Sequence, residues 1–389
     1  MEQTAVEKKF GKYVMASMIT MFLQSAYSMI DGLFVSNLIG DTALSAVNVA
    51  WPIIAVVTAI GTGVGCGGAV MMSTKQGEGK NEESNIVRAN VILALLASSI
   101  VVTILFLILL TPLLKLMGAE GELLRLSQIY GRVMLTGGVL QILSCGLTPL
   151  LRNDNRSVSA MMIMVGGLFA NLGLDFVFMY VFHMGIGGAA GASLCAQLFT
   201  TVCCLMILCT KKTDPIRLSQ FMIRKEYWKK FFKTAVSPFG ISLTPSLLIL
   251  YLNVACLKFG GDLAVNAYAL ISSTVGSYRV LLIGVAEGIQ PLASYAYGAH
   301  DFHAIRKIRN KAVITAIGVS FFLFIFTIAT ARFYPAIYGY EGEAAEFGYH
   351  AVVVTAAQLI FTGLVRGTYS FFYSVGKENF SLFMSFFDR

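Results

Sequence analysis

The stretch VILALLASSIVVTILFLILL, residues 91–110, contains no charged residue and decides the fold class of this chain. About 20 apolar residues in an α-helix span the hydrocarbon core of a bilayer. The run is continuous rather than alternating between apolar and polar residues. It therefore indicates a transmembrane helix and not a strand of a membrane barrel.

Apolar segments of this kind recur along all 389 residues and are separated by charged segments. Charged residues make up 13% of the chain and hydrophobic residues 56%, with a mean hydropathy of +0.73. Soluble domains carry about 25% charged residues, so much of this surface must face lipid. No cleavable signal peptide is predicted, because the first apolar run is too long for one. We expect an all-α membrane protein of about ten full helices, near residues 13–39, 48–72, 86–110, 130–151, 158–183, 187–210, 233–257, 264–290, 312–331 and 347–374.

Basic residues are distributed unevenly between the two ends of these helices. With a cytoplasmic N-terminus, 21 of the 29 Lys and Arg lie in inner segments, against four in outer loops: Lys115, Arg125, Lys258 and Arg332. The positive-inside rule therefore predicts a multi-pass protein of the bacterial cytoplasmic (inner) membrane with its N-terminus in the cytoplasm. The same distribution explains the net charge of +8, so we expect the lipid bilayer and no nucleic acid as a partner.

The residue types that carry enzyme chemistry are scattered. Seven cysteines fall inside apolar segments without metal-ligand spacing, and four histidines lie apart in loops and helix ends. No phosphate-binding loop or nucleophile constellation occurs. We therefore expect neither an enzyme nor a cofactor.

The sequence repeats itself at a constant offset. Gly40-Asp41 corresponds to Gly261-Asp262 (261 − 40 = 221), and the pattern Gly-x-Glu-Gly-Glu at positions 118–122 recurs at 339–343. A repeat with an even number of helices returns to the same side of the membrane. This predicts two parallel six-helix repeats, an architecture used by alternating-access transporters.

The repeat predicts where the chain divides. We expect an N-terminal six-helix lobe at residues 1–210, a cytoplasmic linker at 211–232 and a C-terminal lobe at 233–389. A full second copy would end near position 431 (210 + 221), so this C-terminal lobe is missing its last two helices. We interpret the chain as incomplete; a natural ten-helix variant is the alternative.

Two carboxylates inside predicted helices of the first lobe are candidate functional groups. Asp31 lies nine residues before Gly40, and Asp175 lies eight residues before His183. At about 1.5 Å per residue, both lie roughly 12–14 Å inward from the outer helix ends. Ionisable groups at such depth are costly and are functional candidates by default.

Polar side chains accompany both aspartates. Asn171 shares the face of Asp175, and Ser193 reaches a similar depth on the next helix. Carboxylate, amide and hydroxyl oxygens suit Na⁺, and two neighbouring carboxylates could equally carry a proton, so both coupling ions stay open. The structural alternative is that Asp31 caps a helix end and Asp175 is satisfied by Asn171. Further candidates, for a substrate cavity, are Gln24, Tyr27, Ser28, Gln197, Thr200 and Glu287.

Three blocks of sequence resemble one family. Residues 29–35 (MIDGLFV), followed by Gly40, resemble the first-helix signature of the multidrug and toxic compound extrusion (MATE) transporters of bacteria. Residues 171–175 (NLGLD) and 185–193 (GIGGAAGAS) are similar to the family's fifth and sixth helices. Residues 288–292 (GIQPL) resemble the end of its eighth helix.

The resemblance implies a V-shaped transporter that exports small organic cations in exchange for Na⁺ or H⁺. The family's cation site maps onto Asp31, Asn171 and Asp175, and Ser193 stands where members often have threonine. One branch also uses carboxylates in helices seven and ten, and this chain has none there. Helix one lacks the proline at which some members bend it. We expect a monomer.

Two other classes of function remain as alternatives. A flippase for lipid-linked saccharides or precursors, from the same superfamily, would place cationic residues in its cavity, and the candidates are Arg132, Arg279 and Arg366. A membrane enzyme or passive channel is the third class, but a channel does not need a two-lobe repeat.

Overall fold

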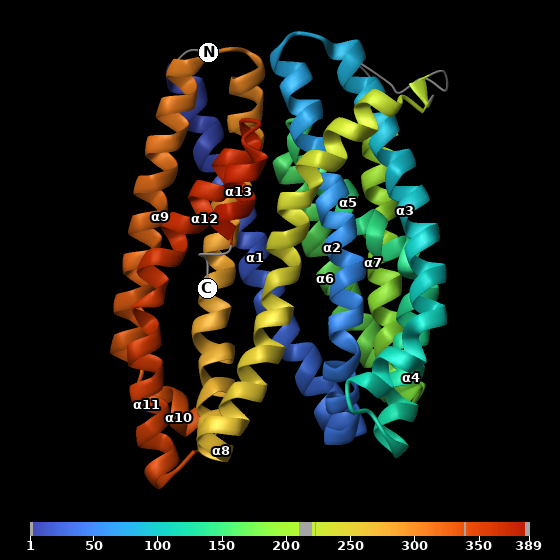
Figure 1. Ribbon diagram of the computed structural model, residues 1–389, viewed down its shortest axis with the longest axis vertical. Helices are drawn as coiled ribbons and strands as arrows, with labels where there is room; N and C mark the ends of the chain where they lie inside the picture. Colours follow the sequence, from blue (N-terminus) through green and yellow to red (C-terminus); the bar gives the residue numbers. More distant parts are fainter. Residues whose placement is uncertain (1–2, 210–219, 222, 338–339, 386–389) are drawn as a thin grey trace. The chain divides into compact units, whose positions relative to one another are not determined.

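The computed structural model describes residues 3–209, 220–221, 223–337 and 340–385, some of them within helices by their backbone alone. These residues form helices joined by short turns, with no strand among them (Figure 1). The helices are α1 (Gln3–Ile39), α2 (Asp41–Gly77), α3 (Asn81–Leu116), α4 (Gly121–Thr136), α5 (Gly138–Asn153), α6 (Ser157–Asp175), η1 (Phe176–Val181), α7 (Gly185–Cys209), α8 (Lys225–Gly298), α9 (Phe302–Thr330), α10 (Phe333–Ile337), α11 (Gly342–Ala356), α12 (Gln358–Ser374) and α13 (Glu378–Ser385).

The apolar segments predicted from the sequence are helical. Across the described residues, seven helices are long and apolar enough to cross a membrane, and the bent pair α4–α5 forms an eighth candidate span. The two remaining predicted segments, 13–39 and 233–257, lie in α1 and in the first part of α8. The prediction of an all-α membrane protein is confirmed.

The predicted helix 130–151 is wrong as a single straight span. Its residues belong to α4 and α5, which meet at an angle of 58° around Gly137. A β-carbon at Gly137 would lie 2.2 Å from the side chain of Leu194 in α7. Helices often kink at glycine and other small residues, and here the kink leaves room for Leu194.

The structure confirms the repeat at the same offset as in the sequence. Adding 221 to the first positions of α3, α4 and α6 (Asn81, Gly121 and Ser157) gives 302, 342 and 378, the first positions of α9, α11 and α13. α1 and α2 correspond to the two parts of α8, which breaks at Gly261 (φ 60°) as the chain does at Gly40 (φ 116°). Several helices of the two repeats therefore begin at matching positions, whereas α3 runs unbroken to Leu116 and the matching part of the second repeat is divided into α9 and α10.

Contacts between residues divide the chain into two compact units. Unit 1 is Met1–Phe22, Thr244–Tyr297 and Asp301–Arg389, and unit 2 is Leu23–Leu243 with Gly298–His300. α1 and α8 therefore each contribute to both units. The predicted lobes 1–210 and 233–389 and the linker 211–232 describe the repeat along the sequence and stay a prediction; residues 210–219 and 222 lie outside the described residues.

The glycines of α2 let other helices of unit 2 approach closely. A β-carbon at Gly65 would lie 2.4 Å from backbone atoms of Gly146 in α5. At Gly67 it would lie 2.5 Å from the carbonyl oxygen of Phe231 in α8. The glycine-rich stretch 61–68 is therefore a packing surface.

Unit 1 repeats part of this packing with α1 in the place of α8. A β-carbon at Gly288 would lie 2.6 Å from Cα of Val14, and one at Gly67 would lie 3.0 Å from Cα of Ala235. Gly288 is the counterpart of Gly67 at the offset of 221, and Ala235 is the counterpart of Val14. The first part of each repeat's first helix thus packs, by the same contact, on the second helix of the other repeat.

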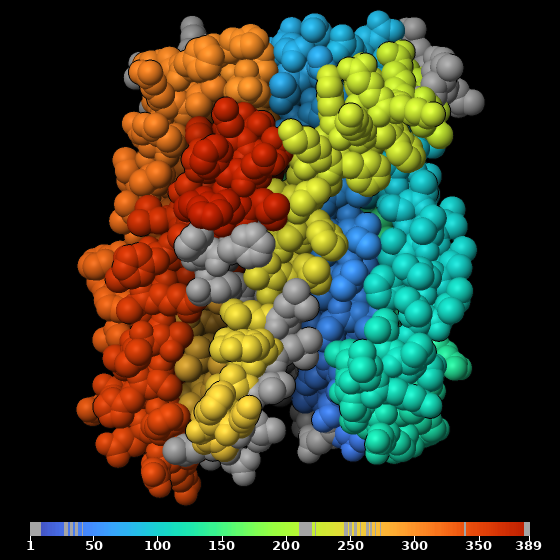
Figure 2. Space-filling view, in the orientation of Figure 1, coloured from blue at the N-terminus to red at the C-terminus, as the bar shows by residue number. Residues whose placement is uncertain are grey.

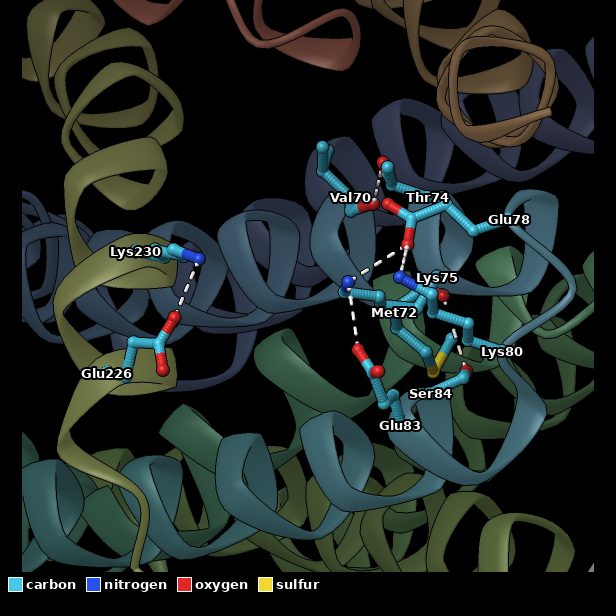
Figure 3. A network of polar contacts seen from close by, with 10 residues as sticks. All are labelled: Val70, Met72, Thr74, Lys75, Glu78, Lys80, Glu83, Ser84, Glu226 and Lys230. Atoms are coloured by element: carbon cyan, nitrogen blue, oxygen red, sulfur yellow. Dashed lines mark hydrogen bonds and ion pairs between the residues drawn. The ribbon is translucent and has the colours of Figure 1, made fainter. Parts of the chain in front are cut away.

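The exposed side of α3 and the turn between α2 and α3 differ as expected for a membrane protein. On α3, large apolar side chains (Ile100, Val101, Ile104 and Ile108) are exposed, and this helix reaches the surface in the cyan region of Figure 2. Such a continuous apolar face suits lipid rather than water. At the turn between α2 and α3, Lys75 instead forms ion pairs of 2.9 Å with Glu78 and Glu83 (Figure 3).

Candidate cation site

α6 carries two of the predicted ligands on one face near its end. Nδ2 of Asn171 donates a hydrogen bond of 2.9 Å to Oδ2 of Asp175, one helical turn later. Asp175 is completely buried, and Asn171 is 6% exposed. Removing a carboxylate from water costs free energy unless polar groups or a cation surround it. The pair therefore marks a polar place inside unit 2.

The helix changes its winding immediately after Asp175. Phe176–Val181 form a short π-helix, η1, that continues directly from α6. π-Helical turns are rare and frequently occur at functional sites. The regular α-helical winding therefore ends at the buried carboxylate.

The packing of α6 on α7 brings Ser193 to the level of Asp175. A β-carbon at Gly167 of α6 would lie 2.8 Å from Oγ1 of Thr200 in α7, which fixes the level of these two positions. The turn at residues 182–184 reverses the chain, so residues earlier in α7 pair with later residues of α6. Asp175 lies eight residues after Gly167, and Ser193 lies seven residues before Thr200. Asp175 and Ser193 therefore both lie about 11–12 Å from the contact between Gly167 and Thr200, in the same direction along the two helices.

Asp31 lies in the part of α1 that belongs to unit 2, and its side chain is partly buried. Val35, one turn later, is 2% exposed and belongs to the apolar core of this unit. Residues i and i+4 share one face of a helix. Asp31 is therefore on the face of α1 that packs on unit 2.

Tyr130 connects the two aspartates, and the sequence analysis missed it. This tyrosine of α4 is 6% exposed, and its hydroxyl interacts electrostatically with both Asp31 and Asp175. Both carboxylates therefore lie within electrostatic range of this buried tyrosine in unit 2. One of 16 tyrosines gives little signal in a sequence, and only its position on α4, beside buried Ser127 and Gly131, could have drawn attention to it.

The predicted cavity residues are not all placed with this cluster. Gln24 is exposed, and the side chains of Tyr27 and Ser28 lie outside the described residues. Gln197 is half-buried, and Thr200 donates its hydroxyl hydrogen to the carbonyl of Ala196 in its own helix. Glu287 belongs to unit 1, separate from the unit that contains the aspartates.

The candidates for other chemistry are dispersed. Arg132 is exposed on α4, whereas Arg279 and Arg366 belong to unit 1, where Arg366 is 3% exposed. Within the described ranges, no three His, Cys, Asp or Glu residues converge as metal ligands. In the same part of the chain, the cysteines form no disulfide.

Comparisons with known proteins give matches over most of the chain. The MatE family model matches residues 16–177 and 240–388. The multidrug export protein MepA of Staphylococcus saprophyticus subsp. saprophyticus is 22% identical, and that of Staphylococcus aureus (strain N315) is 24% identical; each alignment covers 94% of this chain and 83% of the relative.

Solved structures share the fold. An outward-facing multidrug resistance MATE family transporter of the MOP superfamily superposes with a TM-score of 0.92 at 24% identity, over 98% of this chain and 85% of that one. A MOP superfamily transporter from Pyrococcus furiosus, described by a binding pocket of reverse polarity, superposes with a TM-score of 0.91 at the same identity and coverage.

Proposed function

The chain belongs to the MatE family, and from this premise we propose that it is a secondary-active antiporter that exports small organic cations in exchange for an inward-moving cation. Members of this family are transporters, so this membrane protein is a transporter and not an enzyme. The multidrug export proteins among its relatives support drug-like organic compounds as substrates.

The buried, hydrogen-bonded pair of Asn171 and Asp175, with Asp31 and Tyr130 in electrostatic range of one another, carries the proposal for the coupling site. Asp31 and Asp175 come from different helices, and both interact with the same buried hydroxyl. Na⁺ would be held by carboxylate, amide and hydroxyl oxygens. A proton would instead bind one of two carboxylates whose mutual repulsion opposes a second negative charge. The proposed ligands are Asp31, Asn171, Asp175, Ser193 and Tyr130.

The path of α1 gives the site a connection to the rest of the protein. Asp31 lies in the part of α1 that packs in unit 2, whereas Phe10, Tyr13 and Val14 are buried in unit 1. A cation at Asp31 neutralises charge on this helix and favours one packing of it over another. A ligand that binds two conformations differently shifts their populations, and this would couple cation entry to alternating access.

The experiment measures export of the dye ethidium from vesicles containing the protein, driven by a Na⁺ gradient alone and then by a pH gradient alone. The gradient that drives export identifies the coupling ion. Asp31→Asn and Asp175→Asn should insert normally and lose export under that gradient. Glu122→Gln, on the exposed start of α4, is the control and should export normally. Unchanged export in both aspartate variants would refute the site.

Buried Arg366 supports a second candidate function, a flippase for lipid-linked saccharides or precursors. A guanidinium inside a membrane helix is costly and suits an anionic pyrophosphate group. Tight binding of a lipid pyrophosphate, together with no dye export under either gradient, would favour the flippase.

The remaining proposals concern the location, membrane orientation, oligomeric state and cofactors of the protein. We place the protein as a monomer in the bacterial cytoplasmic membrane with its N-terminus in the cytoplasm, because of the basic inner segments. It needs no cofactor beyond the coupling ion. The test introduces a single cysteine at residue 2 or at residue 115 and treats intact cells with a membrane-impermeant thiol reagent. Only the cysteine at residue 115 should be labelled.

A further inference from the structure

The first part of α3 presents two completely buried polar side chains to the interior of unit 2. Arg88 is 1% exposed and Asn90 is 0% exposed. The cation site uses neither residue, and both reach across to other helices. Buried polar groups of this kind are retained only with specific partners, and their partners lie at the two ends of the connection between the repeats.

Arg88 holds the end of α7. Its Nη1 donates a hydrogen bond of 3.2 Å to the carbonyl oxygen of Leu208, one residue before the helix ends at Cys209. The last four carbonyls of a helix lack partners within it, and the negative end of the helix dipole attracts a cation. The guanidinium also donates to Oδ1 of Asn85 and lies 3.6 Å from Oδ1 of buried Asp154. These contacts hold the guanidinium of Arg88 at the end of α7.

Asn90 holds the start of α8. Its Oδ1 accepts hydrogen bonds from the backbone N–H of Arg224 at 2.9 Å and from Nε1 of Trp228 at 3.1 Å. Its Nδ2 donates to the carbonyl of Ile86 in α3, which orients the amide oxygen toward α8. One side chain thus fixes the residue before α8 and the first turn of that helix.

Apolar packing and charge reinforce this attachment. Phe231 is completely buried in the core of unit 2, and Phe221 and Trp228 pack against that core. Glu226 forms an ion pair of 2.9 Å with Lys230 of its own helix, and the charge of Lys75 at the end of α2 adds a weaker attraction (Figure 3). The connection between α7 and α8 is therefore attached to unit 2 on both sides.

α8 leaves unit 2 only further along. The boundary between the units falls after Leu243, and the prolines Pro238 and Pro245 flank it within the helix. Proline removes a backbone hydrogen bond and is a common cause of helix kinks. The part of α8 that can bend is therefore inside the helix and not at its attached start.

We propose that Arg88 and Asn90 form a clamp that keeps both ends of the connection between the repeats on unit 2 throughout transport, so that α8 bends between residues 238 and 245 when the units move. This proposal rests on the proposed alternating-access function. The two residues are positioning residues: they touch neither the cation nor the substrate, and they act by holding α7 and α8.

The experiment locks the clamp. In a variant whose seven native cysteines are replaced, Asn90→Cys and Arg224→Cys are joined by a short bis-methanethiosulfonate reagent, and ethidium export is measured before and after. The backbone nitrogen of Arg224 lies 2.9 Å from Oδ1 of Asn90, so the reagent can bridge the two positions. The joined protein should export at the rate of each single-cysteine variant treated with the same reagent. A loss of about tenfold or more that a reducing agent reverses would show that the contact must open, and would overturn the clamp.

Hydrogen exchange on the unmodified protein provides the second measurement. During turnover, the amides of residues 226–237 should stay as protected as at rest, and those around Pro245 should exchange faster. Loss of protection at 226–237 would overturn the clamp even if the cysteine variants did not fold. If the unmodified protein exports ethidium under neither gradient, the proposed function fails. The clamp is then still tested by comparing amide hydrogen exchange with and without ethidium, with and without Na⁺, and at neutral and low pH.

Discussion

The two repeats of this chain share one backbone and differ in their chemistry. Several helices begin at matching positions, and the pair α4–α5 has a counterpart in the pair α11–α12, where Ala357 lies at the junction in place of a glycine. Two members of the polar cluster have apolar residues at the matching positions of the second repeat. Asp31 corresponds to Leu252 and Tyr130 to Ala351, and the clamp residues Arg88 and Asn90 correspond to Arg309 and Lys311.

The difference teaches which features the fold requires. Helix breaks and apolar faces recur in both repeats, because the same packing problem has to be solved twice. Buried carboxylates and a buried guanidinium are costly, and each needs polar partners of its own. Arg309 shows this directly: it is exposed and donates to its neighbour Asn310, whereas Arg88 is buried and joins α3 to α7.

The largest expected effect tests Arg88 against Arg309. Arg88→Gln removes the hydrogen bond to Leu208 and leaves buried Asp154 with Arg156, at 3.7 Å, as its remaining guanidinium, which should lower the free energy of unfolding by about 3 kcal/mol. Arg309→Gln removes an exposed group and should change it by less than about 0.5 kcal/mol. Thermal unfolding in detergent measures both. Equal losses of stability in the two variants would mean that Arg88 and Arg309 contribute alike to their respective repeats.

The next effect concerns close packing at Gly65. Its counterpart in the second repeat is Ala286, so one repeat tolerates a β-carbon where the other has none. Gly65→Ala places that carbon 2.4 Å from backbone atoms of Gly146 and should destabilise unit 2 by about 1–3 kcal/mol. Gly318→Ala in α9 has open space and is the control. An unfolding temperature that does not fall in the Gly65 variant contradicts the close approach of α2 and α5.

A smaller effect tests Tyr130 as a ligand. Tyr130→Phe removes the hydroxyl shared by Asp31 and Asp175 and should weaken the apparent affinity for the coupling ion by about tenfold, or about 1.4 kcal/mol. The measurement is the dependence of ethidium export on ion concentration. Tyr278→Phe, in unit 1, removes a hydroxyl bonded to Tyr334 and should leave this dependence unchanged. Similar shifts in both variants would remove Tyr130 from the site.

The smallest effect concerns the charged turn between α2 and α3. Partial burial opposes ionisation of Glu78, but hydrogen bonds from Lys75 and Lys80 outweigh it and hold the pKa of Glu78 below its ordinary 4.5. The lowered pKa means that the ionised form stabilises the fold above pH 4.5, and that this contribution is lost as the pH falls through the folded pKa. Glu78→Gln should cost about 0.2–1 kcal/mol at pH 7, and less in high salt.

The control for this last prediction comes from the second repeat. Position 299, which corresponds to Glu78, is already alanine. The difference in unfolding temperature between Ala299→Gln and the parent protein should therefore not change with pH. A Glu78→Gln difference that does not shrink as the pH falls below 4.5 would contradict the ion-pair explanation.

The sequence predicted the features that depend on distance along a helix axis. Apolar run lengths located the helices, the constant offset located the repeat, and counting residues from the outer ends put Asp31 and Asp175 at one depth. The structure adds that both interact with Tyr130.

The features that the sequence analysis missed depend on which helices touch. Leu194 of α7 lies against the bend at Gly137 and leaves no room for a β-carbon there, and Asn90 accepts a hydrogen bond from Arg224, which is far away in sequence. A lone tyrosine or asparagine in an apolar helix has many possible roles, and only its neighbours in space select one. The sharing of α1 and α8 between units was missed for the same reason.

That sharing has a consequence for how the protein is made. All of unit 2 except Gly298–His300 is complete once residue 243 has been synthesised, whereas Val14 finds its partner only when Gly288 has been added. At about 5–20 residues per second, the start of α1 waits roughly 14–55 s for that partner. During biogenesis the nascent N-terminal helix is therefore half assembled: its part from Leu23 onward can pack in unit 2, whereas its part up to Phe22 still waits for its partners.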